Sequence, residues 1–175
     1  LYTAAIDRGY TGASILLDEP IIFDMGPDLE PYEPTNYDET FEGPITLRHA
    51  VEKSRNVPAV RMIDQLGPEQ VVEYARRFGF ESPLPPFLSI ALGSAEATLL
   101  ELTSAYAVFP NRGIRMRPYQ IVRILDRDGN VLEEHGPESH DAVRADTAYV
   151  MLNILRGVVQ RGTGMRAAWL NWPLA

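Results

Sequence analysis

A polar break between two helix-like stretches constrains the fold of this chain more than any other feature of its sequence. Residues 46–67 read TLRHAVEKSRNVPAVRMIDQLG. Thr46 is suited to cap a first helix that runs to about Lys53. Asn56 is a good N-cap for a second helix, and Pro58 fits the first turn of that helix, where its missing N–H does no harm. The pattern therefore predicts two consecutive helices, the second of which ends at Gly67.

The tripeptide Ser54-Arg55-Asn56 fills the break. Taken alone it is ordinary helix punctuation, with Asn56 as a cap and Ser54 as a polar residue at a helix end. Because side chains alternate along an extended loop, we expect those of Ser54 and Asn56 to point inward and that of Arg55 to point outward. A hydroxyl and an amide offer hydrogen-bond donors and acceptors, so the break is also a candidate for chemistry.

Helical periodicity and turn residues alternate along the rest of the chain. Thr98 and Glu101 form a capping box, and Asp146 is the expected N-cap of a long helix. Asp128-Gly129 lies between two apolar-alternating arms, which predicts a β-hairpin within residues 119–134. The expected elements are helices over residues 1–8, 46–53, 56–67, 68–78, 98 to about 111 and 146 to about 161, and brief strands or extended loop over 14–17 and 21–23. These elements predict an α+β fold that is mostly helical.

The composition argues against several classes of function. The chain has 175 residues, 45% of them hydrophobic, which suits one globular domain. Its formal net charge of −8 is opposite to what a nucleic-acid binder needs. It has no cysteine, which excludes disulfides and thiolate metal sites. His135, His140 and Asp141 do not have the spacing of a metal site, so we expect no metal and no cofactor.

Both ends of the chain read as interrupted elements. Residues 1–8, LYTAAIDR, have a C-terminal cap in Gly9 but no N-cap before Leu1. The last seven residues, WLNWPLA, stop on apolar side chains. We therefore expect the 175 residues to be part of a longer domain.

Seven segments spread along the chain form a further pattern. They are Tyr32-x-Pro34-x-Asn36-Tyr37-Asp38, residues 41–48 (FEGPITLR), Ser54-Arg55-Asn56 with residues 57–60, residues 89–93 (SIALG), residues 102–107 (LTSAYA), Arg123-Ile124-Leu125-Asp126-x-x-Gly129 and Arg161-Gly162-Thr163-Gly164. In this order and at these spacings, they together resemble the transpeptidase domain of class A penicillin-binding proteins. The resemblance covers essentially the whole chain and implies the penicillin-binding transpeptidase and serine β-lactamase-like fold, of which residues 1–175 form a partial domain.

The chemistry of this family needs three motifs, and this chain contains one of them. Ser-x-x-Lys supplies the nucleophile, Ser-x-Asn faces it, and Lys-Thr-Gly closes the third side of the site. Lys53 is the only lysine, no serine stands three residues before it, and Lys-Thr-Gly does not occur. The resemblance implies that the two other motifs flank this chain in a parent protein, and that the chain alone is inactive.

The resemblance implies that the parent is a peptidoglycan D,D-transpeptidase, which cross-links stem peptides through a serine acyl-enzyme and is acylated by β-lactam antibiotics. It assigns catalytic roles to Ser54 and Asn56, and substrate binding to Asn56. It implies a bifunctional enzyme with a glycosyltransferase domain, at the extracytoplasmic face of the bacterial inner membrane. The membrane is contacted only through parts of the parent outside this chain.

Two alternatives remain open from the sequence. The same fold serves D,D-carboxypeptidases and β-lactamases, in which water replaces the acceptor amine. It also serves non-catalytic modules that sense or bind penicillin. The patterns at Asn36-Tyr37-Asp38 and at residues 123–129 favour the transpeptidase.

Overall fold

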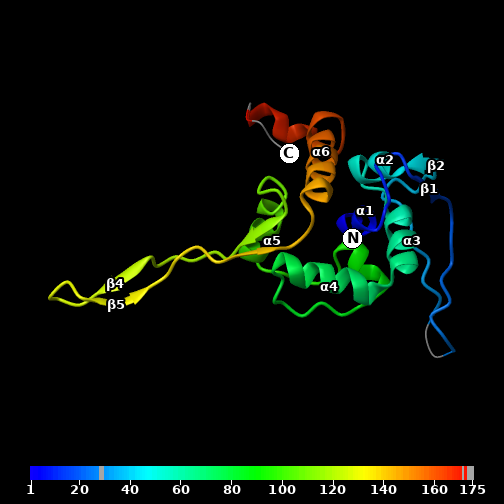
Figure 1. Cartoon of the computed structure of the whole chain (residues 1–175). Helices are drawn as coiled ribbons and strands as arrows, with labels where there is room; N and C mark the ends of the chain where they lie inside the picture. The colour runs from blue at the N-terminus through cyan, green and yellow to red at the C-terminus, as the bar shows by residue number, and fades with distance from the viewer. Residues whose placement is uncertain (28–29, 171, 173–175) are drawn as a thin grey trace.

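Within residues 1–27, 30–170 and 172, which the computed structural model describes, six α-helices form the body of the molecule (Figure 1). A narrow two-stranded arm extends from this body. The helices are α1 (Tyr2–Asp7), α2 (Leu47–Glu52), α3 (Asn56–Leu66), α4 (Pro68–Phe78), α5 (Leu99–Ala107) and α6 (Ala145–Arg161). Two 3₁₀ helices are also present: η1 (Leu88–Leu92) lies between α4 and α5, and η2 (Met165–Leu170) follows α6. The predicted α+β class, mostly helical, is confirmed.

The hydrophobic core lies among the helices. Leu47 of α2, Ile63 of α3 and Ile154 of α6 have no exposed surface. In α3, Val57, Val60 and Ile63 recur at the spacing that places apolar side chains on one face of a helix. The core therefore holds α2 and α3 rigidly on both sides of the polar break.

Strands β1 (Ile15–Asp18) and β2 (Gly43–Thr46) form an antiparallel pair beside the helices. Ile15 lies opposite Thr46, and Asp18 lies opposite Gly43. The brief strand expected at 14–17 is thus confirmed with a shift of one residue. The long segment between the two strands returns on itself through a bridge between Phe23 and Tyr32.

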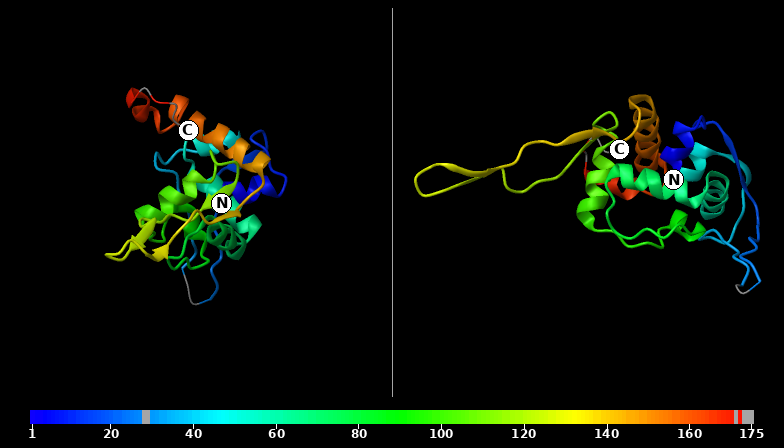
Figure 2. Two further views of the ribbon diagram at one scale, coloured as in Figure 1. Left: turned by 60° about the vertical axis from the view of Figure 1, so that its left-hand side comes forward. Right: turned by 60° about the horizontal axis from the view of Figure 1, so that its bottom comes forward.

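The arm consists of two further antiparallel pairs. Strands β3 (Ile114–Met116) and β6 (Ser139–Asp141) form its base, and β4 (Arg123–Leu125) and β5 (Val131–Glu134) form its tip. Figures 1 and 2 show the tip standing away from the helices in every view. The predicted hairpin is confirmed, but every residue of β4 and β5 is exposed, so the apolar alternation marks no buried face in this structure.

Most helix boundaries follow the predicted caps. The Thr46 hydroxyl accepts from the His49 amide, and Thr98 and Glu101 make both bonds of the capping box. The prediction for Asp146 is wrong, because α6 begins earlier, with Arg144 as its N-cap. Asp146 lies in the first turn, where its carboxylate accepts from the Thr147 amide and interacts favourably with the helix dipole.

No helix among the described residues is long and apolar enough to cross a membrane. The expectation about the final apolar residues falls mostly on 171 and 173–175, which lie outside the described part of the chain.

Candidate functional site

Ser54 occupies the turn that ends α2, in a position that usually belongs to glycine. The Ser54 amide donates to the Val51 carbonyl at 3.1 Å, and the Arg55 amide donates to the Ala50 carbonyl at 2.9 Å. These two bonds define a Schellman ending, whose key residue is left-handed. Ser54 has φ of 55°, so it adopts this backbone despite its side chain.

The same molecule shows the usual solution at two other helix ends. Gly9 after α1 and Gly79 after α4 have φ of 101° and 98° and make the same pair of backbone bonds. A side chain in the left-handed region costs about 1–2 kcal/mol. Such strain, at a residue whose side chain is exposed to solvent, is typical of a functional position.

Asn36, and not Asn56, caps helix α3. Its side-chain oxygen accepts from the backbone amides of Asn56 and Val57, at 2.9 and 3.2 Å. The prediction that Asn56 is the N-cap is therefore wrong: Arg55 holds that position, and Asn56 is the first helical residue. A residue 20 positions earlier supplies the cap, which frees the Asn56 side chain to donate to the Thr35 carbonyl at 2.9 Å.

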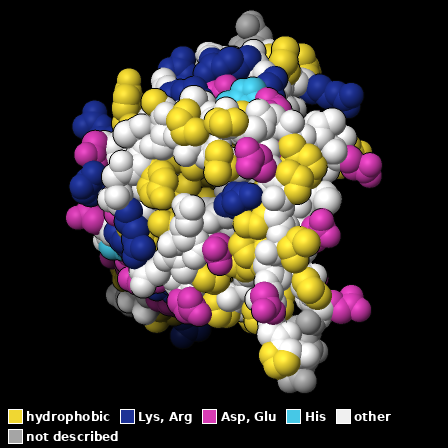
Figure 3. All heavy atoms as spheres, turned by 90° about the vertical axis from the view of Figure 1, so that its right-hand side faces the viewer, with side chains coloured by type: hydrophobic (Ala, Val, Ile, Leu, Met, Phe, Trp, Pro, Cys, Tyr) yellow, Lys and Arg dark blue, Asp and Glu magenta, His cyan; other side chains and the backbone are white. Residues whose placement is uncertain are grey.

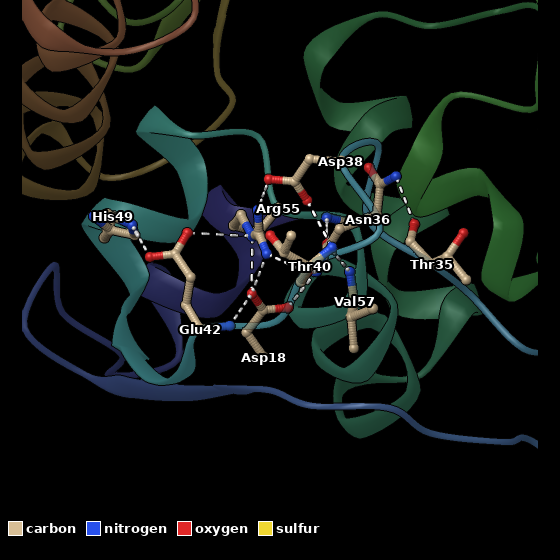
Figure 4. Close-up of polar contacts among 10 residues, drawn as sticks. Asp18, Thr35, Asn36, Asp38, Thr40, Glu42, His49, Arg55 and Val57 are labelled. Atoms are coloured by element: carbon tan, nitrogen blue, oxygen red, sulfur yellow. Dashed lines mark hydrogen bonds and ion pairs between the residues drawn. The ribbon is translucent and has the colours of Figure 1, made fainter.

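Arg55 points into the protein, which contradicts the prediction that it points outward. Its side chain is only 7% exposed. Nε and Nη2 each lie 2.8 Å from one oxygen of Asp18, and Nη1 donates to Asp38 at 2.9 Å (Figure 4). Nη2 also donates to the Thr40 carbonyl. Because Ser54 is left-handed, the chain does not alternate as an extended loop would, and the middle side chain of the tripeptide turns inward.

Asp18 is the fully buried partner at the centre of this network. Its carboxylate accepts from the Asn36 amide group at 2.7 Å, from the Glu42 backbone amide at 3.1 Å, and from Arg55. A buried charge is tolerated when it is paired and its remaining lone pairs are satisfied. The end of β1, the segment 35–42 and the polar break are thus joined in one network.

The charges of the network support one another. Burial opposes the charge of Arg55, but the hydrogen bonds to Asp18 and Asp38 outweigh it and raise the pKa of Arg55. Hydrogen bonds from Thr40, and then the Arg55 guanidinium, lower the pKa of Asp38. The acidic stretch 38–42 therefore contributes one ion-pair partner, Asp38, directly to the site. The Glu42 carboxylate, in turn, lies 2.9 Å from Nε2 of His49 in α2.

The C-terminal end of α6 holds the other side of the break. Glu52 of α2 is 5% exposed and accepts two bonds from Arg161, at 2.8 and 2.6 Å. The Thr163 amide donates to the Glu52 carbonyl at 3.0 Å. Gly162 has no room for a side chain, because a Cβ there would overlap that carbonyl. The turn at Gly162-Thr163-Gly164 thus contacts Glu52, two residues before Ser54 in the chain.

Figure 3 views the molecule from the side of β1 and β2, where hydrophobic, acidic and basic side chains are intermixed. No group of three or more His, Cys, Asp or Glu side chains in the described part of the chain is arranged to hold a metal ion.

Sequence reasoning placed Ser54 and Asn56 at one junction but missed what holds them. Asp18 reads as the polar end of a short strand, and its burial has no local signal. Asn36 and Asp38 belong to a segment quoted for the resemblance, yet nothing in their spacing reveals contact with a helix 20 residues later. Only the pairing of β1 with β2 brings these groups together.

Comparison with known proteins agrees with the fold and with the motifs. The family model of the penicillin-binding protein transpeptidase domain matches residues 1–175. Penicillin-binding protein 1A of Pseudomonas aeruginosa is 34% identical over 98% of this chain and 27% of its own length. Penicillin-binding protein 1A of Neisseria gonorrhoeae is 37% identical over 98% of this chain and 22% of its own length.

The crystal structure of penicillin-binding protein 1A from Haemophilus influenzae superposes with a TM-score of 0.84 and 27% identity. The alignment covers 96% of this chain and 31% of that one. The chain therefore spans about a quarter of the length of the curated relatives it matches. With a match over its full length and relatives above 30% identity, the chain belongs to the penicillin-binding protein transpeptidase domain family.

Proposed function

We propose that this chain forms part of a peptidoglycan D,D-transpeptidase and supplies the Ser-x-Asn side of its active site. One observation carries the proposal: Ser54 is strained and exposed, on a junction that buried groups fix from both sides. Membership of the family, and relatives named penicillin-binding protein 1A, give this site its chemical context.

The proposed reaction is acyl transfer in two steps. A serine of the Ser-x-x-Lys motif attacks the carbonyl carbon between the two terminal D-Ala residues of a stem peptide. Its C–O bond forms as the C–N bond breaks, the serine proton passes to the leaving amine, and D-Ala departs. An amine of a second stem peptide then attacks the ester carbonyl, its surplus proton returns to the serine, and the cross-link forms.

Ser54 and Asn56 have separate roles in this scheme. The Ser54 hydroxyl both accepts and donates, so it can relay the proton between the motif lysines and the leaving amine. The Asn56 amide can hold the peptide group of the acyl chain and hydrogen-bond the catalytic lysine. The nucleophile and Lys-Thr-Gly come from the parent protein outside residues 1–175, so the chain alone is expected to be inactive.

The remaining expectations follow from the same assignment. The partners are peptidoglycan stem peptides and β-lactam antibiotics, and the parent acts in the cell envelope, on the extracytoplasmic face of the inner membrane. Anchoring belongs to other parts of the parent. The match to the transpeptidase family model and the relatives named penicillin-binding protein 1A favour the transpeptidase over D,D-carboxypeptidase or β-lactamase chemistry.

Covalent labelling by a fluorescent penicillin tests the proposal. The full-length parent should be labelled, a Ser54→Ala variant should be labelled about 100-fold more slowly, and the 175-residue chain should not be labelled. An unlabelled parent would mean that the fold serves binding or architecture, and the enzyme assignment would be dropped. Labelling of the 175-residue chain would show that the nucleophile had been misplaced.

A further inference from the structure

The side-chain amide of Asn36 uses its whole hydrogen-bonding capacity to connect three parts of the chain. Its oxygen accepts from the amides of Asn56 and Val57, while its nitrogen donates to Asp18 and to the Thr40 carbonyl, at 2.7 and 2.8 Å. An amide side chain has two donors and two acceptor sites, so none is left over. At 3% exposed, Asn36 lies beneath the site surface and not on it.

Arg55, the middle residue of the tripeptide, also holds this junction. Its guanidinium contacts Asp18, Asp38 and the Thr40 carbonyl, so rotation of the peptide between Ser54 and Asn56 would break several bonds at once. Two of these partners, Asp18 and Thr40, are also the partners of Asn36. Figure 4 shows both side chains reaching the Asp18 carboxylate.

We propose that Asn36 and Arg55 are positioning residues that together set the direction of the Ser54 hydroxyl and the Asn56 amide. This inference rests on the function proposed above. Asn36 fixes the start of α3, and therefore the direction in which the side chain of Asn56, the first helical residue, points away from the backbone. Arg55 keeps Ser54 left-handed, because its buried side chain forces the preceding residue to remain in the turn. A misplacement of about 1 Å at a reacting group can cost about 100-fold in rate.

The charge partner Asp18 determines which variants are informative. Removing Arg55 outright leaves a buried carboxylate without its cation, and the domain would fail to fold. Arg55→Lys keeps the charge but loses the planar fork that reaches three partners. Asn36→Ala keeps the Arg55–Asp18 pair intact and removes only the cap and the link. Ile154→Val, which shortens a fully buried side chain that makes none of the network's hydrogen bonds, serves as the control for lost stability.

The experiment uses the full-length parent, with acylation by a fluorescent penicillin measured over a range of concentrations. Asn36→Ala and Arg55→Lys should lower the limiting acylation rate constant by about 10- to 100-fold. The penicillin concentration that gives half of the limiting rate should change much less, and Ile154→Val should be acylated at the wild-type rate. The same variants should speed hydrogen exchange of the Asn56 and Val57 amides, whose bonds depend on Asn36.

The outcomes separate this inference from the proposed function. A wild-type parent that is not labelled overturns both. If the wild type is labelled, and both variants are folded and label at its rate, only the positioning role is wrong. The positioning role is also wrong if Ile154→Val loses as much rate as they do, since the loss then follows stability. If Arg55→Lys fails to fold, Asn36→Ala and the amide exchange decide the matter alone.

Discussion

Replacing Ser54 by glycine should make the protein more stable and less active. The residue has φ of 55° in a helix ending that Gly9 and Gly79 form elsewhere without strain. Arg112, exposed and with φ of 57°, lies in the same kind of turn after α5, because the Arg112 and Gly113 amides donate to the Phe109 and Val108 carbonyls. Arg112→Gly is therefore a matched control with the same backbone and no place in the site.

The size of the gain follows from two opposing terms. Relief of the left-handed backbone contributes about 1–2 kcal/mol. The greater freedom of glycine in the unfolded chain offsets about 0.4–1 kcal/mol of this. The net stabilisation is about 1 kcal/mol, which for a domain of roughly this size raises Tm by about 2–4 °C. Ser54→Ala, which keeps the strain and removes the hydroxyl, should show no such gain.

Thermal unfolding and penicillin acylation of the full-length parent measure both effects. Ser54→Gly and Arg112→Gly should gain similar stability, while only Ser54→Gly loses acylation rate, by about 100-fold or more. The strain argument fails if Arg112→Gly is stabilised and Ser54→Gly is not. The site assignment fails if Ser54→Gly is labelled as fast as the wild type.

Two further predictions concern groups around the site and the core. The Ser82 hydroxyl, with neighbouring amides, holds the pKa of Glu101 well below its usual 4.5. The stability that ionised Glu101 contributes is therefore complete above about pH 4.5 and is lost as pH falls through the folded pKa. Glu101→Gln should lower Tm at neutral pH and flatten the acid limb of a Tm–pH profile, and an unchanged acid limb would contradict this. In Gly157→Ala, the new Cβ would overlap the Glu52 carboxylate that Arg161 holds in place. The overlap should cost about 1–3 kcal/mol, which exceeds the roughly 1 kcal/mol that the helix propensity of alanine contributes. Urea unfolding should show this loss of stability, while Gly136→Ala, whose Cβ meets no atom within 4 Å, should be neutral.

Local signals in the sequence were enough to predict the helices. Thr46 and the Thr98–Glu101 box act on their own neighbours, and the structure confirms both. Such signals depend on hydrogen bonds within one turn, which is the range that a sequence pattern can describe. The hairpin at residues 123–134 was predictable for the same reason.

The errors have a common physical cause. Asn56 is of a residue type that often caps helices, but the Asn36 side chain accepts from the amides at the start of α3 from a loop distant in the sequence. Arg55 was expected in solvent, because burying an arginine requires partners that no local pattern announces. Those partners, Asp18 and Asp38, are 37 and 17 residues away in the chain. The sequence places Ser54 and Asn56 at one junction, whereas the tertiary contacts that orient their side chains leave no local pattern.

The buried network also dictates when the site can form during folding. Helices α2 and α3 flank the junction at Ser54 and Arg55 and can begin to form from local contacts. The orientation of its side chains depends on Asp18 and Asn36, so β1 must first pair with β2 and the segment between them must close. Closing such a loop is entropically costly and slow compared with helix formation. A nascent chain therefore acquires the helices around Ser54 early, and the geometry of the site is among its last native features.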